Sequence, residues 1–145
     1  METLIVPDTL DSLAKIGDYV KRAAAAAGLD SKAAYNLRLA VDEFATNIIL
    51  HGYQEAGLSG EVVIRGEMAD NALTIIIEDT GAAFDPRSLK LPEAEELARP
   101  IEEREPGGLG IFLALNGVDD FNYERDGDRN RNIFVMRRKG AGAEG

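Results

Sequence analysis

The sequence has no cysteine, no tryptophan and a single histidine, His51. Without cysteine there can be no disulfide bond, no thiolate nucleophile and no cysteine-ligated zinc or iron–sulfur centre, and one histidine is too few for a multi-histidine metal site. Apolar runs are short as well: none reaches the roughly 18 residues of a membrane span, and the start of the chain does not resemble a signal peptide. We therefore expect a cytoplasmic protein without a membrane partner, whose metal chemistry would use oxygen ligands.

Basic charge is also scarce, with 16 Lys and Arg residues against 26 Asp and Glu residues and a formal net charge of −10. A broad basic surface for a phosphate backbone is therefore missing, which argues against direct nucleic-acid binding. ATP is not excluded, because a Mg²⁺ ion and backbone amides can hold a triphosphate locally. The 145 residues, 45% hydrophobic and 29% charged, fit one globular domain. We assign that domain to residues 1–139 and expect a disordered tail at 140–145.

The spacing of apolar residues predicts an α+β fold in the order strand–helix–helix–strand–strand, an irregular segment, then helix–strand–strand. Short turns between adjacent strands favour antiparallel pairing, so we expect a two-layer sandwich, a mostly antiparallel sheet with helices on one face. The predicted strands are residues 3–6, 61–68, 72–78, 120–124 and 132–138, with turns at Asp70-Asn71 and Asp126-Gly127-Asp128. One helix begins at an Asp8 N-cap and stops at Gly28; the next runs from Asp30 or Ser31 to Gly52, with Leu37, Val41, Phe44, Ile48 and Ile49 buried; the last follows Gly107.

Glu43 and Asn47 lie four residues apart in the second predicted helix. At 3.6 residues per turn both side chains project from the same side. The carboxylate can accept a proton from a water or a hydroxyl, and the amide oxygen is a hard ligand suited to Mg²⁺. The same pair would also fit an ordinary solvated helix face, so by itself it does not identify a site.

A second pattern follows the apolar strand 72–78, which ends in Asp79-Thr80-Gly81. A carboxylate fixed at a strand end can accept a hydrogen bond from an exocyclic amine such as that of adenine, and a glycine lets a flat ring approach the backbone. Taken alone, Asp-x-Gly is more often simple turn punctuation.

The third pattern is Gly107-Gly108-Leu109-Gly110, directly before an apolar helical stretch. Backbone amides at a helix start point outward and favour an anion such as phosphate. Hinges and tight turns use the same residues, and neither a P-loop nor a dinucleotide-binding fingerprint occurs in the chain. The 25 or so residues before the glycines are too long for a plain connector and indicate a lid, a binding loop or a disordered insert.

In this order the three patterns resemble the successive motifs of the GHKL ATPase superfamily, and within it the anti-sigma factor serine/threonine kinases. The similarity covers nearly the whole chain and implies the histidine kinase-like ATPase fold. It rests on Leu39-Ala40-Val41-Asp42-Glu43-Phe44-Ala45-Thr46-Asn47 with His51-Gly52-Tyr53, on Asp79-Thr80-Gly81 with Phe84-Asp85-Pro86, and on residues 107–112.

The resemblance also implies roles for single residues. Glu43 would be the general base, Asn47 would bind the nucleotide through Mg²⁺, and Asp79 would read adenine beside Gly81. Phosphate binding and lid movement would fall to Gly107, Gly108, Leu109 and Gly110. Some kinases of the family carry an arginine directly before the lid glycines; here either Arg104, three positions before Gly107, takes that role or no residue does.

Members of the family transfer the γ-phosphate of ATP to a Ser or Thr of an anti-sigma factor antagonist, and many sequester a sigma factor, often as homodimers. The resemblance therefore implies ATP and Mg²⁺ as cofactors, and a STAS-type antagonist, a sigma factor and a second copy as partners. Two alternatives stay open. Six glutamates between Glu93 and Glu105 would repel a triphosphate and favour an ATP- or ADP-gated binding module without kinase activity. A detached histidine-kinase catalytic domain is the other, although the chain has no phosphoacceptor helix.

Overall fold

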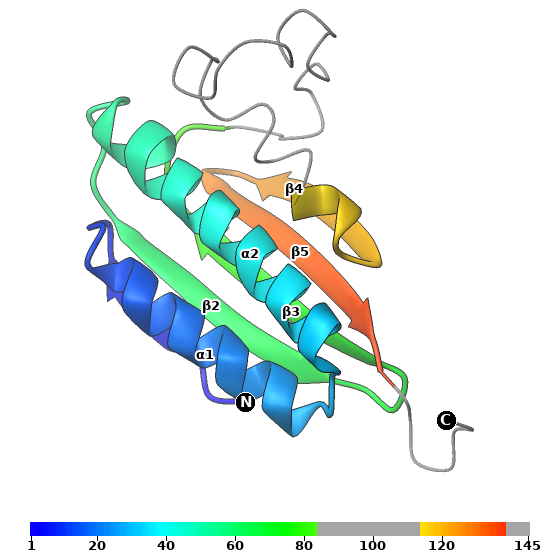
Figure 1. Ribbon diagram of the computed structural model, residues 1–145. Coiled ribbons are helices and arrows are strands. Elements are labelled where there is room, and N and C mark those ends of the chain that lie inside the picture. The colour runs from blue at the N-terminus through cyan, green and yellow to red at the C-terminus, as the bar shows by residue number, and fades with distance from the viewer. Residues whose placement is uncertain (84–113, 139–145) are drawn as a thin grey trace, which may run out of the picture.

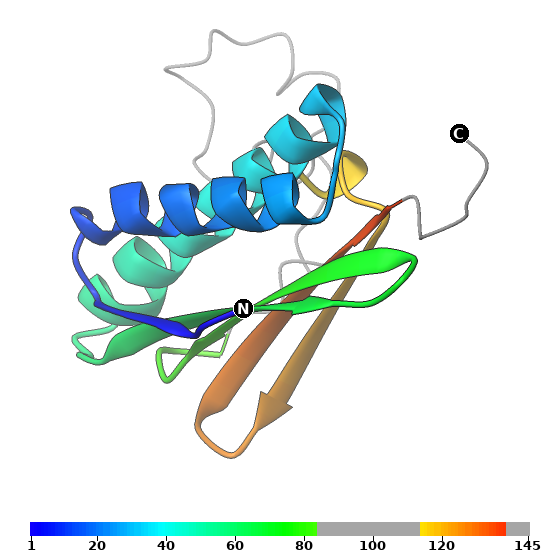
Figure 2. The ribbon, with the colours of Figure 1, turned by 90° about the horizontal axis from the view of Figure 1, so that it is seen from below.

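The computed structural model describes residues 1–83 and 114–138. Its five strands form one sheet in the order β1-β2-β3-β5-β4, in which every neighbouring pair is antiparallel. Helices α1 and α2 lie side by side over one face of this sheet (Figures 1 and 2), which confirms the predicted α+β sandwich. The elements are β1 (Leu4–Pro7), α1 (Ser12–Ala26), α2 (Ser31–Asn47), the π-helical segment η1 (Ile48–Gln54), β2 (Glu61–Met68), β3 (Ala72–Asp79), β4 (Asp120–Asp126) and β5 (Arg129–Arg137).

The first helix begins later than predicted, because Asp8 does not cap it. The Asp8 carboxylate instead accepts a hydrogen bond from the backbone N–H of Gly60, at 3.2 Å, and so ties the β1–α1 connection to the start of β2. Helix α1 starts at Ser12, whose hydroxyl donates to the carbonyl of Pro7 at 2.8 Å. The predicted stop is confirmed, since Gly28 adopts a φ of 71°, a conformation that favours glycine. The Asp8 cap was therefore wrong, and the stop was right.

The second helix starts where the sequence indicated and ends later. Asp30 is its N-cap, with the carboxylate accepting from the N–H of Ala33 at 2.8 Å. Gly52 does not end it: the chain continues helically through η1 to Gln54, and Gly52 is buried inside that segment. The cause is Tyr53, which is fully buried and extends the apolar stripe by one more turn. The chain turns at Gly57 instead, where φ is 69°.

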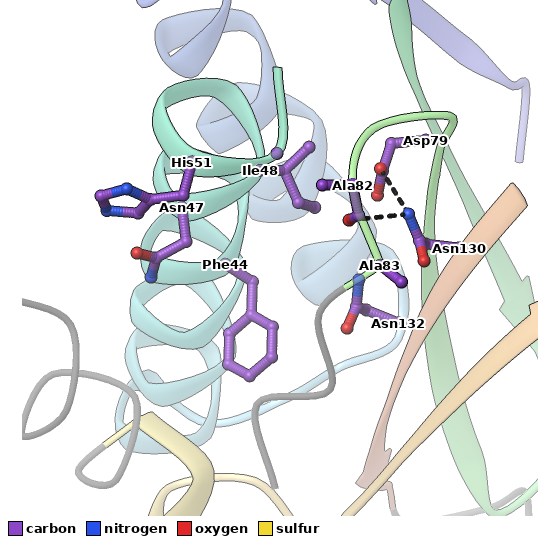
Figure 3. A pocket seen from close by; sticks show the side chains of 10 residues that line it. Phe44, Asn47, Ile48, His51, Asp79, Ala82, Ala83, Asn130 and Asn132 are labelled. Atoms are coloured by element: carbon purple, nitrogen blue, oxygen red, sulfur yellow. Dashed lines mark hydrogen bonds between the residues drawn. The ribbon is translucent and has the colours of Figure 1, made fainter. Parts of the chain in front are cut away.

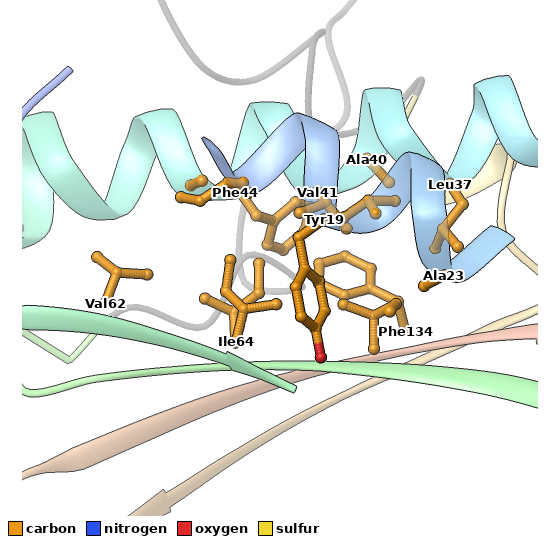
Figure 4. Packing of buried hydrophobic residues seen from close by; sticks show 14 of the residues in the cluster. Tyr19, Ala23, Leu37, Ala40, Val41, Phe44, Val62, Ile64 and Phe134 are labelled. Carbon is orange, nitrogen blue, oxygen red and sulfur yellow. The ribbon is translucent and has the colours of Figure 1, made fainter. Parts of the chain in front are cut away.

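The core lies between the helices and the sheet (Figure 4). Leu37, Val41, Phe44 and Ile49 are buried as predicted, whereas Ile48 is half-buried. Phe44 of α2 contacts Phe121 of β4 and Phe134 of β5, with ring centroids 5.0 and 4.9 Å apart. Edge-on and tilted aromatic pairs of this kind add to the stabilisation from burial alone. The contacts fix α2 against the β4–β5 half of the sheet and thereby set where Glu43 and Asn47 stand.

Two hairpins set the register of the sheet. The β2–β3 turn is at Asp70-Asn71 as predicted, and the β4–β5 turn uses Gly127, whose φ is 62°. Strand β5 begins at Arg129, three residues earlier than predicted, and its extra residues place Asn130 directly opposite Asp79. The third predicted helix was expected to include Leu115 and Val118; of it, residues 114–118 are described, and only 114–116 are helical, so the helix ends before Val118. The predicted tail at 140–145 lies outside the described residues.

Candidate functional site

A pocket of about 120 Å³ lies between α2–η1 on one side and the ends of β3 and β5 on the other (Figure 3). Of the residues that the sequence singled out, Asn47 and Asp79 line it. Glu43 is one helical turn before Asn47, and Gly81 is two residues after Asp79. The structure thus brings two of the three sequence patterns to one place. The lining residues are Phe44, Asn47, Ile48, His51, Gly52, Asp79, Ala82, Ala83, Asn130 and Asn132.

Glu43 and Asn47 are linked through the helix backbone. The Asn47 side-chain Nδ2 donates to the carbonyl oxygen of Glu43 at 2.9 Å, which orients the amide and leaves its oxygen for another partner. The Glu43 side chain is half-buried, and this burial, together with the negative charge of Asp42, raises the pKa of its carboxyl. A carboxylate with a raised pKa is a better proton acceptor than an exposed one.

Asp79 ends β3 and is 4% exposed. Its Oδ1 accepts two hydrogen bonds, from the N–H of Gly81 at 2.9 Å and from Nδ2 of Asn130 at 2.9 Å. Burial raises the pKa of the Asp79 carboxyl, while these two hydrogen bonds and the charge of Arg125 oppose the rise. The carboxyl group is therefore held in one orientation at the pocket wall.

Gly81 allows a close approach of two backbone segments. A Cβ at this position would lie 2.7 Å from the carbonyl oxygen and 2.8 Å from the carbonyl carbon of Gly52 in η1. The same carbonyl oxygen accepts a hydrogen bond from the N–H of Ala82 at 2.9 Å. Gly81 thus lets the turn after β3 pack against η1, a role that the sequence did not indicate. The predicted approach of the adenine ring to Gly81 stays a prediction.

Asn130 is a site residue that the sequence reasoning missed. Besides Asp79, its Nδ2 donates to the carbonyl oxygens of Gly81 at 3.1 Å and Ala82 at 3.4 Å. Its Oδ1 accepts from Arg125 at 2.9 Å and from the hydroxyl of Tyr123. The glycine turn at residue 127 signalled the hairpin, but only the β3–β5 register puts Asn130 opposite Asp79. Asn130 therefore fixes both the carboxyl and the turn that follows it.

Several predicted site residues cannot be placed in this way. Residues Arg104, Gly107, Gly108, Leu109 and Gly110, and the Phe84-Asp85-Pro86 motif, lie outside the described residues. His51 lines the pocket, and its Nδ1 lies 2.6 Å from Oε2 of Glu55, one turn further along η1.

The polar groups of the pocket suit a magnesium-bound triphosphate better than a metal held by protein alone. Residues 1–83 and 114–138 contain no cluster of three or more acidic, histidine or cysteine side chains that could cage a metal ion. Mg²⁺ often takes one or two protein ligands and completes its shell with water and phosphate oxygens. The amide oxygen of Asn47 is a hard ligand of the kind that this donor set requires. No helix in the described parts of the chain has the length and apolar character needed to cross a bilayer.

The chain is similar to curated proteins that are named serine-protein kinases. Over 92 residues the chain is 32% identical to the serine-protein kinase RsbW of Bacillus thuringiensis (strain Al Hakam), a match covering 63% of this chain and 56% of the relative. The same-named protein of Bacillus anthracis is 30% identical over 92 residues, with the same coverage. The chain thus matches little more than half the length of these relatives.

Solved structures share the fold at low sequence identity. The SiaB–SiaC complex from Pseudomonas aeruginosa contains a chain that matches with a TM-score of 0.60 and 16% identity, covering 94% of this chain and 89% of that one. The histidine kinase domain of the blue-light-activated histidine kinase from Erythrobacter litoralis matches with a TM-score of 0.51 and 18% identity, covering 86% and 58%. The model of the histidine kinase-like ATPase domain matches residues 6–138, which include every described strand and helix from α1 onward. With the sandwich and a pocket lined by Asn47 and Asp79, this match establishes that the chain belongs to the histidine kinase-like ATPase domain family.

Proposed function

We propose that the chain is an ATP-dependent serine/threonine protein kinase that acts as an anti-sigma factor in bacterial partner switching. The observation that carries the proposal is a pocket lined by Asn47 on one wall and Asp79 on the other, with Glu43 one helical turn before Asn47. The names of the relatives, all serine-protein kinases, support the same chemistry. On family grounds, regulation of transcription would follow from capture and release of a sigma factor.

Each described site residue has a task in this proposal. Asp79 accepts a hydrogen bond from the base of ATP, and Asn47 supplies an amide oxygen to Mg²⁺. Glu43 takes the proton of the substrate hydroxyl. At the same time the hydroxyl oxygen bonds to the γ-phosphorus, and the bond between that phosphorus and the ADP oxygen breaks. Mg²⁺, when bound, offsets negative charge on the phosphates. Arg104, Gly107, Gly108, Leu109 and Gly110 are proposed to contact the phosphates.

The proposed partners are proteins. The phosphate acceptor is a Ser or Thr of a STAS-type anti-sigma factor antagonist, and a sigma factor and a second copy of the chain are further partners. We also propose a cytoplasmic location, since both proteins act there. A structural neighbour with the same fold was solved as a complex of two proteins, SiaB and SiaC, which is compatible with a partner-binding role for the fold.

The test is transfer of the γ-phosphate from labelled ATP, with Mg²⁺, to a purified antagonist. Glu43→Gln keeps the shape of the side chain and removes the base, so transfer should fall about 100-fold or more while ATP binding persists. Glu67→Gln is the matched control. Glu67 is an exposed residue of β2, whereas the strand residues that line the pocket belong to β3 and β5. Absence of transfer by the wild type, or undiminished transfer by Glu43→Gln, would reject the kinase mechanism.

A second candidate is a nucleotide-gated binding module that holds ATP or ADP and changes its affinity for a partner without phosphorylating it. The six glutamates between Glu93 and Glu105 favour it, because they carry negative charge close in sequence to the proposed phosphate-binding glycines. Stoichiometric phosphoserine on a purified partner would exclude the module. Nucleotide-dependent partner binding without phosphate transfer would favour it over the kinase.

A further inference from the structure

The side-chain oxygen of Asn132 on β5 is buried and has no hydrogen-bond partner among the described residues. The residue is 4% exposed and lines the pocket beside Ala83 and opposite Phe44 (Figure 3). Its Oδ1 is the one buried side-chain oxygen or nitrogen, among residues 1–83 and 114–138, without a hydrogen-bond partner. Buried polar groups are almost always paired, so such an atom at a pocket wall calls for a specific explanation.

Asn130, the neighbouring asparagine on the same face of β5, has hydrogen-bond partners for its amide. The two asparagines are two residues apart on β5 and therefore face the same side of the sheet. Asn130 uses both ends of its amide within the protein, on Asp79, Gly81, Arg125 and other groups. Asn130 accordingly has a structural explanation, whereas the Asn132 oxygen has none within the described chain.

An apolar residue would serve the fold better at position 132. The inward-facing residues further along β5, Phe134 and Met136, are buried apolar side chains, and Phe44 adds another apolar surface opposite. Replacing an unpaired buried amide by an apolar group of the same shape usually stabilises a protein. The Asn132 amide therefore lowers the stability of the fold, which is typical of a residue that serves binding.

We propose that Asn132 reads the base of the bound nucleotide, with its Oδ1 accepting a hydrogen bond from the exocyclic amine of adenine. This inference rests on the proposed function, in which the pocket holds ATP and Asp79 contacts the same amine. One amine carries two N–H bonds that point in different directions, so it can serve two acceptors. Phe44 and Ile48 offer apolar surface to a flat ring. A 6-oxo purine has a carbonyl oxygen, a hydrogen-bond acceptor, where adenine has its amine. That oxygen would face the acceptor oxygens of Asp79 and Asn132, so the site selects 6-amino over 6-oxo purines.

The test measures how well the protein distinguishes ATP from purine riboside triphosphate, which lacks the amine and is otherwise the same molecule. Dissociation constants for both nucleotides with Mg²⁺ are measured by calorimetry on the wild type and on Asn132→Leu, which has the same branched shape and no polar atom. The wild type should prefer ATP, and Asn132→Leu should lose about tenfold of that preference, the usual value of one buried hydrogen bond. Asn71→Leu, the same exchange at an exposed hairpin turn, is the control that should keep the wild-type preference.

Thermal unfolding without nucleotide distinguishes a role of Asn132 in recognising the base from a role in stabilising the fold. If Asn132 serves the ligand, Asn132→Leu melts at a higher temperature than the wild type although it binds ATP less tightly. A lower melting temperature, or an unchanged preference for ATP, would overturn the inference while leaving the kinase proposal intact. No binding of either nucleotide by the wild type would overturn both. If the larger apolar side chain prevents folding, Asn132→Ala replaces Asn132→Leu in the binding measurement, where the same loss of preference for ATP is expected.

Discussion

The contact between Gly81 and Gly52 yields a sharp prediction, because two backbone segments meet there without room for a side chain. In Gly81→Ala the new Cβ would stand 2.7 Å from the Gly52 carbonyl oxygen and 3.2 Å from Oδ1 of Asp79. Backbone atoms cannot swing away as a flexible side chain can, so η1 and the turn after β3 must separate.

The expected cost follows from what the separation disturbs. Overpacking of a fitted interior costs about 1–3 kcal/mol. The Ala82 N–H bond to Gly52 and the Gly81 N–H bond to Asp79 are both strained or lost, at about 1 kcal/mol each. A total of about 3–5 kcal/mol would lower Tm by about 10–20 °C in a domain of this size. Nucleotide affinity should fall as well, because the Asp79 carboxyl loses a hydrogen bond that orients it.

Urea unfolding of purified Gly81→Ala measures the change, with Gly52→Ala as its counterpart across the same contact. A Cβ at Gly52 meets only a methyl group of Ile48, at 3.9 Å, and alanine favours helical backbone, so Gly52→Ala should be neutral or stabilising. If Gly81→Ala unfolds within about 0.5 kcal/mol of the wild type, a range typical of neutral surface changes, the close approach does not constrain the fold as argued.

Three further predictions concern ionisable groups. The pKa of Glu43 is raised, so phosphate transfer should fall as pH drops through a value above 4.5; Asp42→Asn removes a like charge and should move this acid limb of the pH–rate profile to lower pH. Glu78 is buried, but Arg129, Arg131 and Arg65 outweigh that burial and lower its pKa, so its stabilisation is complete above 4.5 and is lost as pH falls through the lowered value. Glu78→Gln should therefore destabilise by about 2 kcal/mol at pH 7 in urea unfolding, a penalty that must shrink in acid. Asn130→Ala removes a hydrogen bond to the Asp79 carboxylate and should raise the pKa of Asp79 further, measured by carboxyl NMR titration; an unchanged value would contradict the assigned contact.

The elements followed from local signals where those signals were strong. The Asp30 cap and the glycine at position 28 marked helix ends through the backbone geometry that they favour, and all five predicted strands formed, although β5 begins three residues earlier than predicted. The errors came from distant contacts. Asp8 accepts a hydrogen bond from Gly60 instead of capping its helix. Tyr53 extends the second helix past Gly52, because its ring is buried and its hydroxyl bonds to Glu61 of β2 and to Thr80, directly after β3.

The site residues show the same difference between local signals and distant contacts. Glu43 and Asn47 could be paired from sequence because four residues make about one helical turn, and Asp79-Thr80-Gly81 could be recognised as a motif. Asn130 and Asn132 could not, since their place opposite Asp79 and Ile77 depends on strand register. Register is set by the packing of a whole face, and a shift of one residue would turn both asparagines to the other side of the sheet.

The sequence by itself determined the fold class, the family resemblance and the two short motifs, because these depend on periodicity, turn chemistry and residue order along a few turns of chain. Tertiary structure alone decided that Gly81 meets Gly52, that Asp79 is held by Asn130, and that the Asn132 oxygen at the pocket wall has no partner within residues 1–83 and 114–138. Those facts join residues about 30 to 50 positions apart in the chain. They exist only once hydrophobic packing has fixed α2 against the sheet and paired β3 with β5.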